Sequence, residues 1–258
     1  MPRLITLLTD FGTADGYVGE MKGVLASLAP TSPIVDIAHD VAPHDVDGAR
    51  LTLARYWRRF PEGTVHLVVI DPGVGSARGA LAAASEGRFL VGPDNGVLSP
   101  ALLHGGARCV SLAIPSGAAP TFHGRDVFAP AAAQLAQGAS IESLGEIAES
   151  PEIRRTPEAT RRDDGAVQGE VISVDRFGNA VTNLLAMRGG QVRVAGLTLA
   201  LRRTYADAAP GEAIALVGSS GLVEVAVRDG SAAALLGLVR GSSVVLMPRS
   251  STTTTRGG

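Results

Sequence analysis

The sequence predicts an α/β N-terminal domain with a mainly parallel sheet, followed by a smaller C-terminal antiparallel β-barrel domain. In the first 150 residues, short apolar runs alternate with segments of helical periodicity. This alternation is typical of a parallel sheet covered by helices. Beyond residue 166 the apolar runs are short, rich in Val and Leu, and separated by glycines. Such spacing is typical of a compact antiparallel β-barrel or sandwich, of which we predict the barrel.

The N-terminal elements are expected in the order strand, helix, strand, helix, strand. The strands are predicted from the apolar runs Leu4 to Leu8, Ile34 to Ile37 and Val65 to Ile70. Between them, apolar residues recur at helical spacing, first at Val18, Met21, Val24, Leu25 and Leu28, then at Val46, Ala49, Leu53 and Trp57. This spacing places each set on one face of a helix.

A polar segment with two prolines separates the halves, so we predict domains at residues 1–150 and 167–248 with a linker at 151–166. The barrel strands are expected at Val167 to Val174, Gln191 to Val194, Leu197 to Leu201, Ala213 to Val217, Leu222 to Val227 and Ser243 to Met247. Residues 249–258 contain no core-forming side chain and are expected to be a disordered tail.

Composition narrows the class of protein. With 258 residues, 45% hydrophobic residues and a net charge of -2, the chain is expected to be a globular protein that binds a small molecule. Nucleic acid is not expected as a partner, because its binding usually needs a concentrated basic surface. No apolar stretch is long enough to span a membrane. The single cysteine, Cys109, excludes an internal disulfide, and a cytoplasmic location is expected.

Carboxylates follow two of the predicted strands. Asp10 comes after the first strand, and Asp71 directly follows Ile70. If the strands are parallel, both side chains lie at the carboxyl edge of the sheet, where ligands bind in this architecture. The alternative is that each aspartate caps the following helix or turn. Two carboxylates at one edge favour a site.

The turn from Asp71 to Arg78 is glycine-rich, but it is not a phosphate loop. Arg78 stands where a dinucleotide-binding motif needs glycine, and no Gly-x-x-x-x-Gly-Lys-Ser/Thr sequence occurs. Gly73 and Gly75 instead allow tight backbone conformations. We therefore expect the turn to direct Asp71 and Arg78 into one cavity.

Two histidines, His39 and His44, lie among aspartates and form a candidate metal site. Pro43 interrupts any continuous helix across the pair, and no His-Glu-x-x-His motif or cysteine partner is present. No metal is therefore expected. His66 is expected to be a half-buried structural residue within a strand, and His104 is given no role.

His123 precedes a helical pattern after a proline-rich loop, a position from which an imidazole can enter a cleft. In the second domain, the segment from Asp175 to Asn183 is expected to join two strands as a loop that binds an aromatic ring. The alternative is a plain β-turn with Gly178 at positive φ.

Read together, these segments resemble the S-adenosyl-L-methionine hydroxide adenosyltransferase family, the relatives of fluorinase and chlorinase. The resemblance spans nearly the whole chain through an ordered set of motifs: Thr9-Asp10-Phe11-Gly12, Asp15-Gly16-Tyr17, Met21-Lys22-Gly23, Asp71-Pro72-Gly73-Val74-Gly75, Gly92-Pro93-Asp94-Asn95-Gly96, Phe122-His123-Gly124-Arg125-Asp126, Phe177-Gly178-Asn179 and Gly218-Ser219-Ser220-Gly221.

The resemblance implies hydrolysis of S-adenosyl-L-methionine to adenosine and L-methionine, without metal or organic cofactor, in a homotrimer with the active site between subunits. The family's catalytic Asp-Arg-His set falls on Asp71, Arg78 and His123. The resemblance further implies substrate binding by Asp10 at the ribose, by Phe177 and Tyr205 beside the adenine, and by Asp15, Tyr17, Asp175, Asn179, Ser219, Glu224, Val227 and Asp229.

The halogenating relatives carry a tyrosine at the position of Asp71. A carboxylate repels a halide and accepts a proton from water, so this chain resembles the hydrolytic branch. Three alternatives stay open: a non-catalytic protein that binds S-adenosyl-L-methionine or a nucleoside, an S-adenosyl-L-methionine-dependent halogenase, and a metal-dependent hydrolase using His39 and His44. The sequence also leaves open whether Asp71 or His123 is the base.

Overall fold

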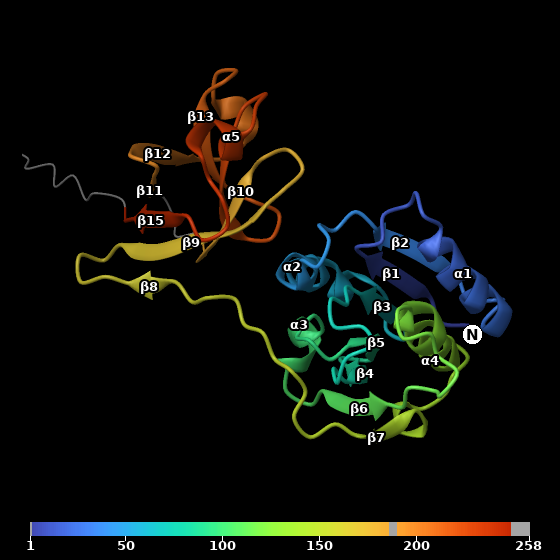
Figure 1. Cartoon of the computed structure of the whole chain (residues 1–258). Helices are drawn as coiled ribbons and strands as arrows, with labels where there is room; N and C mark the ends of the chain where they lie inside the picture. The colour runs from blue at the N-terminus through green and yellow to red at the C-terminus, as the bar shows by residue number, and fades with distance from the viewer. Residues whose placement is uncertain (1, 186–189, 249–258) are drawn as a thin grey trace, which may run out of the picture. The chain divides into compact units, whose positions relative to one another are not determined.

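The computed structural model describes residues 2–185 and 190–248, which form two compact units divided between Arg155 and Thr156 (Figure 1). Each unit has its own hydrophobic core. The domain limits 1–150, 151–166 and 167–248 stay a prediction, and the predicted tail at 249–258 lies outside the described residues. No helix of the described ranges is both long and apolar enough to cross a membrane.

The first unit alternates strands and helices, as its periodicity predicts. Its elements are β1 (Ile5–Thr9), α1 (Tyr17–Leu28), β2 (Ile34–Ala38), α2 (Val46–Tyr56), η1 (Trp57–Arg59), β3 (Val65–Val69), β4 (Ala80–Ser85), β5 (Arg88–Pro93), α3 (Ser99–Leu102), β6 (Arg108–Leu112), η2 (Gly124–Phe128), α4 (Ala129–Ala136), η3 (Ile141–Ser143) and β7 (Gly145–Ile147). The three strands and two helices predicted in this unit are all confirmed.

The sheet of the first unit is mixed, so the prediction of a mainly parallel sheet is only partly right. Its strand order is β2-β1-β3-β5-β4-β6-β7. The pairs β1–β2, β1–β3 and β3–β5 are parallel, whereas β4–β5, β4–β6 and β6–β7 are antiparallel. The antiparallel half arises because the two residues Glu86 and Gly87 between β4 and β5 leave room only for a hairpin.

Helices cover both faces of this sheet, and alternate residues of β3 supply the two cores. Leu67 and Val69 pack in the cluster that contains α1 and α4 residues. Val68, together with Ile70 just after the strand, packs in the cluster that contains α2 residues. Because β3 is buried on both faces, all of its residues except His66 are apolar. The strand that leads to Asp71 is thus held firmly in the centre of the unit.

The second unit is built almost entirely of strands. Its elements are β8 (Thr160–Arg161), β9 (Val167–Val174), β10 (Ala180–Leu185), β11 (Gln191–Val194), β12 (Leu197–Arg202), η4 (Tyr205–Asp207), β13 (Ala213–Val217), β14 (Leu222–Val227), α5 (Ala232–Leu236) and β15 (Ser243–Met247). The six predicted barrel strands are confirmed to within a residue. β8 lies inside the predicted linker and pairs with β9.

Pairing between β9 and β10 closes seven of these strands into a barrel, in the order β10-β14-β13-β12-β11-β15-β9. The barrel is not wholly antiparallel, because β12 and β13 run parallel. This arrangement follows from the chain excursion through η4, which returns β13 in the same direction as β12. The predicted loop from Asp175 to Asn183 is also shorter than expected, since β10 begins at Ala180.

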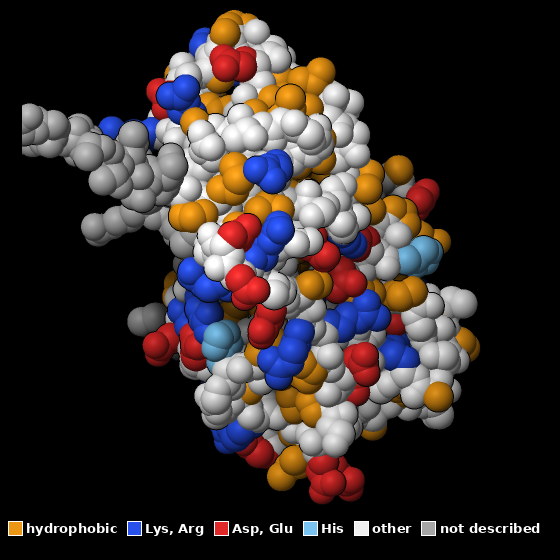
Figure 2. Space-filling model, turned by 90° about the vertical axis from the view of Figure 1, so that its left-hand side faces the viewer, with side chains coloured by type: hydrophobic (Ala, Val, Ile, Leu, Met, Phe, Trp, Pro, Cys, Tyr) orange, Lys and Arg blue, Asp and Glu red, His pale blue; other side chains and the backbone are white. Residues whose placement is uncertain are grey.

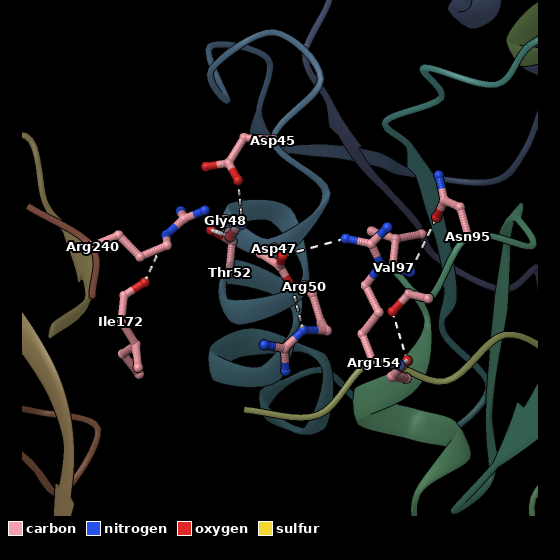
Figure 3. Close-up of polar contacts among 12 residues, drawn as sticks. Asp45, Asp47, Gly48, Arg50, Thr52, Asn95, Val97, Arg154, Ile172 and Arg240 are labelled. Atoms are coloured by element: carbon pink, nitrogen blue, oxygen red, sulfur yellow. Dashed lines mark hydrogen bonds and ion pairs between the residues drawn. The ribbon is translucent and has the colours of Figure 1, made fainter. Parts of the chain in front are cut away.

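The segment just before the division between the units is anchored to the first unit. The Arg154 backbone N–H donates to Ser99 Oγ at 2.8 Å, and Arg154 Nη1 lies 3.3 Å from Asp47 Oδ2 (Figure 3). Asp47 also accepts a hydrogen bond from Arg50 at 3.3 Å. At the start of the same helix, Asp45 caps α2 by accepting a hydrogen bond from the Gly48 N–H at 3.0 Å.

Candidate functional site

Asp10 and Asp71 follow neighbouring parallel strands. β1 and β3 pair in register up to Thr9 and Val69, so the two aspartates leave the sheet at its carboxyl edge. Asn95 holds the backbone just before Asp71 in place, because its Nδ2 donates to the Ile70 carbonyl at 2.9 Å. The Asn95 side chain is itself held by the Val97 N–H at 3.1 Å (Figure 3). The motif around Asn95 was visible in the sequence, but this role was not.

Asp71 and Arg78 form a bidentate pair across the turn. Arg78 Nε donates to Asp71 Oδ1 at 2.9 Å, and Arg78 Nη2 donates to Asp71 Oδ2. The side chains are 5% exposed at Asp71 and 7% at Arg78. The guanidinium also lies 5.4 Å from the centre of the Phe128 ring, which is fully buried. The contact with the Phe128 ring and the hydrogen bonds to Asp71 together fix the orientation of Arg78.

His123 joins this pair through the same arginine. Arg78 Nη2 lies 3.1 Å from His123 Nδ1, and the His123 residue is 4% exposed. His123 directly precedes the π-helical turn η2, which confirms that a helical segment follows it. The three residues predicted to act together are thus linked in the order Asp71, Arg78, His123, with Arg78 within hydrogen-bonding distance of both others.

The turn that carries Asp71 is docked onto the loop before His123. Gly75 has a φ of 75°, and a Cβ added there would lie 2.5 Å from the Pro120 carbonyl oxygen. Only glycine accommodates both this conformation and this close approach. The two segments that carry the predicted catalytic side chains are therefore in direct backbone contact.

Burial and ion pairing act on Asp71 in opposite directions. Desolvation by burial raises the pKa of the Asp71 carboxyl, while the charge and hydrogen bonds of Arg78 lower it. The result is a pKa above the usual aspartate value of 3.8. An aspartate with a raised pKa is a better proton acceptor than one in water.

The predicted substrate residues of the first unit lie in the segment that runs from the end of β1 to the start of α1. Asp10 accepts a hydrogen bond from the His44 backbone N–H at 2.8 Å. Tyr17 begins α1, and its ring packs 5.3 Å from Phe122, the residue before His123. Asp15 is exposed in the loop between β1 and α1.

In the second unit, Tyr205 lies near two of the other predicted substrate residues. The Tyr205 hydroxyl donates to Glu224 Oε2 at 3.5 Å. Burial, followed by the negative charges of Glu224 and Asp175, raises the pKa of Tyr205. Glu224 packs so closely over Gly218 that a Cβ there would lie 1.7 Å from Glu224 Oε1. Ser219 follows Gly218 in the exposed turn between β13 and β14.

The loop after β9 presents an aromatic ring. Phe177 is 76% exposed, whereas Asn179 is buried. Asp175 Oδ1 accepts from the backbone N–H groups of both residues at 2.9 Å, and Asp175 Oδ2 accepts from Asn179 Nδ2 at 2.9 Å. The Asp175 carboxylate is thus used to shape the loop. Gly178 has a φ of 81°, as expected for a tight turn.

Val227 and Asp229 belong to the segment after β14. Val227 is buried at the end of that strand, and Asp229 is exposed with a φ of 56°. The segment after β14 also includes Ser231, which packs against Gly178 in the loop that carries Phe177. A Cβ on Gly178 would lie 2.0 Å from Ser231 Oγ. In the described part of the chain, no hydrogen bond joins Val227 or Asp229 directly to Tyr205 or Ser219.

The histidines outside this group have other partners. Both ring nitrogens of His39 face side chains, and His66 is fully buried instead of half-buried as predicted. His66 Nδ1 lies 2.8 Å from Thr6 Oγ1. Within residues 2–185 and 190–248, no three His, Cys, Asp or Glu side chains are grouped as metal ligands.

Charges of both signs are mixed on the face that Figure 2 presents, where Lys and Arg side chains lie among Asp and Glu side chains. This distribution matches the net charge of -2. Binding to nucleic acid usually relies on basic residues concentrated on one face. The face seen in Figure 2 is not a concentrated basic surface of that kind.

Comparison with known proteins decides the family. The model of the SAM hydroxide adenosyltransferase N-terminal domain matches residues 5–145, and that of the C-terminal domain matches residues 169–245. The chain belongs to the SAM hydroxide adenosyltransferase family. The resemblance seen in the sequence is thereby confirmed over most of the chain.

Members and relatives of this family align over nearly the full chain. The (R)-S-adenosyl-L-methionine hydrolase of Thermus thermophilus is 44% identical over 95% of this chain and 100% of its own. A fluorinase of Actinopolyspora mzabensis is 28% identical over 93% of this chain and 96% of its own. The crystal structure of an uncharacterized conserved protein from Thermotoga maritima superimposes with a TM-score of 0.87 at 33% identity, covering 95% of this chain and 100% of that one.

Proposed function

We propose that this protein hydrolyses S-adenosyl-L-methionine to adenosine and L-methionine by attack of water on the ribose C5′. The family assignment and the high identity to an (R)-S-adenosyl-L-methionine hydrolase support this activity. The same relative supports the R form as the substrate. The observation that carries the proposal is the buried group of Asp71, Arg78 and His123.

The identity of residue 71 favours water over halide as the nucleophile. Asp71 is a carboxylate, whereas the halogenating relatives are expected to carry tyrosine there. A buried carboxylate repels a halide ion, because like charges interact strongly away from bulk water. The same carboxylate accepts a proton from water. Asp71 therefore separates this chain from its halogenating relatives.

Activation of water is the difficult step of this reaction. The sulfonium leaves as a neutral thioether, so no general acid is needed at the methionine sulfur. Free hydroxide at pH 7 would cost about 12 kcal/mol, since bulk water has a pKa near 15.7. Proton removal must therefore occur together with attack on C5′, by a base that already contacts the water.

The arginine assigns different roles to Asp71 and His123. A guanidinium only donates hydrogen bonds, so His123 Nδ1 accepts from Arg78 and the imidazole proton is on Nε2. In this tautomer Nε2–H donates to the water oxygen and orients it. Asp71 then takes the proton, using a lone pair that Arg78 does not occupy. Arg78 stabilises the negative charge that develops on the oxygen.

The rest of the substrate is assigned by the family resemblance and by the chemistry of the side chains. Asp10 binds the ribose hydroxyls near the catalytic group. Asp15 and Tyr17 complete the binding residues of the first unit. In the second unit Phe177 and Tyr205 flank the adenine, with Asp175, Asn179, Ser219, Glu224, Val227 and Asp229 around it. A homotrimer with the active site between subunits, a cytoplasmic location and turnover without a cofactor belong to the same proposal.

Incubation of the purified protein with S-adenosyl-L-methionine in ¹⁸O-labelled water, with and without chloride, tests this function. Adenosine that carries ¹⁸O at its 5′ oxygen, formed equally in both samples, is the expected product. 5′-Chloro-5′-deoxyadenosine would instead identify a halogenase, and ligand bound without product would identify a binding protein. Asp71→Asn serves as the matched inactive control, and light scattering measures the oligomeric state.

A further inference from the structure

A short loop between β2 and α2 holds the segment that carries Asp10. His39 Nδ1 lies 2.9 Å from Thr9 Oγ1, and the His39 carbonyl accepts from the Gly12 N–H at 2.7 Å. The His44 N–H donates to Asp10 Oδ2 at 2.8 Å. Both flanks of Asp10 and one of its oxygens are therefore attached to this loop.

His39 connects the end of β1 with an aspartate on β2. His39 Nε2 lies 3.1 Å from Asp36 Oδ1, and Asp36 Oδ2 accepts from Lys22 Nζ at 2.6 Å. Because a carboxylate only accepts, His39 Nε2 carries the proton and Nδ1 accepts from the Thr9 hydroxyl. Thr9 Oγ1 in turn lies 3.4 Å from the Phe11 N–H. The series therefore starts at the backbone N–H of Phe11, beside Asp10, and runs through Thr9 and His39 to the Asp36 carboxylate.

This arrangement of hydroxyl, imidazole and carboxylate is not a nucleophilic site. Thr9 is fully buried, so its oxygen cannot reach a substrate. His39 Nδ1 is hydrogen-bonded to Thr9, and Nε2 lies against the Asp36 carboxylate, so neither nitrogen faces a substrate. A buried ring held between two elements in this way acts by fixing the backbone around it.

His44 adds a second sign that this loop is shaped for Asp10. Its φ of 67° places a residue other than glycine in the left-handed region, a conformation that costs free energy. In that conformation its N–H points to Asp10 Oδ2. The other carboxylate oxygen, Asp10 Oδ1, accepts no hydrogen bond from the described residues. It is therefore left for a ligand hydroxyl.

We infer that His39 is a positioning residue for recognition of the ribose hydroxyls, and that it acts through the Thr9–Gly12 segment on the Asp10 carboxylate. The inference rests on the proposed function, because that function places the ribose at Asp10. Loss of the His39 ring frees the Thr9 hydroxyl and the backbone beside Asp10. Contacts to the adenine and to C5′ do not depend on this chain of hydrogen bonds.

The test compares the binding of adenosine with that of 2′,3′-dideoxyadenosine, measured by calorimetry on the full chain. We expect the wild-type protein to bind adenosine at least about tenfold more tightly than dideoxyadenosine, because dideoxyadenosine lacks the hydroxyls that would pair with Asp10. His39→Ala should lose most of this preference while its affinity for dideoxyadenosine changes little. Thr9→Val, which removes the hydroxyl but keeps the side-chain shape, should do the same.

Two further variants make the result specific. Asp10→Ala should abolish the preference, and adding His39→Ala to it should have no further effect on the ratio, since both act on one interaction. His39→Gln, which keeps an amide acceptor and donor, should restore part of the preference. His104→Ala is the control, because that histidine lies outside the network.

Equal weakening of both ligands by His39→Ala would overturn the inference, because it would indicate a general structural defect. A wild-type protein without preference would also overturn it, whether or not hydrolysis occurs. Loss of the preference in His39→Ala supports the inference even if no S-adenosyl-L-methionine is consumed. The inference and the proposed function can therefore fail separately.

Discussion

Two histidines of the first unit, His39 and His123, are buried to a similar extent but have opposite surroundings. His39 is 8% exposed and has a carboxylate at one ring nitrogen and a hydroxyl at the other. His123 is 4% exposed, and an arginine separates its Nδ1 from the Asp71 carboxylate. No hydrogen bond to His123 Nε2 is found in the described ranges.

This difference shows how one residue type can serve structure or chemistry. A histidine whose two nitrogens both face neighbouring side chains, like His39, stabilises those neighbours. A histidine whose Nδ1 is fixed by an arginine, like His123, keeps a defined tautomer, and the proposed mechanism uses its Nε2. Chain position alone does not separate the two cases, since both residues lie in segments that lead into a helix.

The largest effect is expected for Asp71→Asn, because the amide cannot accept a proton from water. We expect kcat to fall by about 10²- to 10⁴-fold, the usual contribution of a general base. Adenosine affinity should stay close to that of the wild type. Steady-state assays of adenosine release measure the first effect and calorimetry the second. Full activity in this variant would remove Asp71 from the mechanism, and Asp47→Asn provides a carboxylate control outside the site.

Arg78→Met is the next largest change, and it affects both activity and stability. We expect kcat to fall by about 10²- to 10³-fold, as for loss of one donor to a developing oxyanion. Because Asp71 would remain buried without its partner, the free energy of unfolding measured in urea should fall by about 3–5 kcal/mol. A stable but inactive variant would mean that Asp71 becomes neutral when Arg78 is absent.

The pH profile of activity separates the effect of burial on the pKa of Asp71 from the effect of Arg78. With a pKa raised by burial, Asp71 becomes protonated above the usual aspartate value of 3.8 as the pH falls. Activity should therefore decline on the acid side at a pH above 3.8. Since Arg78 lowers the pKa of Asp71, residual activity in Arg78→Met should decline at a higher pH than in the wild type. An unshifted profile of kcat/KM would contradict the assignment of Asp71 as base.

Substitutions of His123 distinguish its two nitrogens. A glutamine amide nitrogen lies near the position of Nε2, whereas an asparagine amide lies near Nδ1. If Nε2–H orients the water, His123→Gln should retain more activity than His123→Asn, by about tenfold for one hydrogen bond. Both variants are compared at saturating substrate. The reverse order would show that contact with Arg78, and not with water, is the function of this histidine.

The smallest effect on activity is expected for substitution of His66, which is buried like His39 and lies away from Asp71 and Arg78. Its expected contribution is to stability. Burial lowers the pKa of His66 to about 4. Its stabilising contribution is present above pH 6.5 and is lost as the pH falls towards 4, by about 3 kcal/mol. Urea unfolding at pH 7 and pH 4.5 should show this loss in the wild type and a smaller one in His66→Phe. Equal losses in both proteins would contradict it.

Sequence reasoning predicted the strands and helices that carry strong periodicity. β1, β3 and α1 were found because their apolar residues repeat at strand or helix spacing. The antiparallel half of the first sheet was missed, because β4 is rich in alanine and has no clear strand pattern. The parallel pairing of β12 with β13 depends on how the barrel closes, which short sequence windows do not report.

The contacts within the candidate site were only partly predictable. The proximity of Asp71, Arg78 and His123 was expected from family resemblance, and the structure places them together. The parts played by Asn95 and Phe128 were not foreseen, since a side chain that holds a carbonyl or supports a guanidinium leaves no separate sequence signal. His39 was considered only as a metal ligand, because its hydrogen-bond partners lie on β1 and β2.

The contact between Gly75 and the Pro120 carbonyl has a thermodynamic consequence. Since the turn and the loop touch through their backbones, the side chains that we propose activate water are ordered before any nucleoside binds. Ligand binding then spends little free energy on arranging the protein, and the reacting water meets dipoles that need no reorganisation. A bulkier residue at position 75 would convert this preset arrangement into one that each substrate molecule must assemble anew.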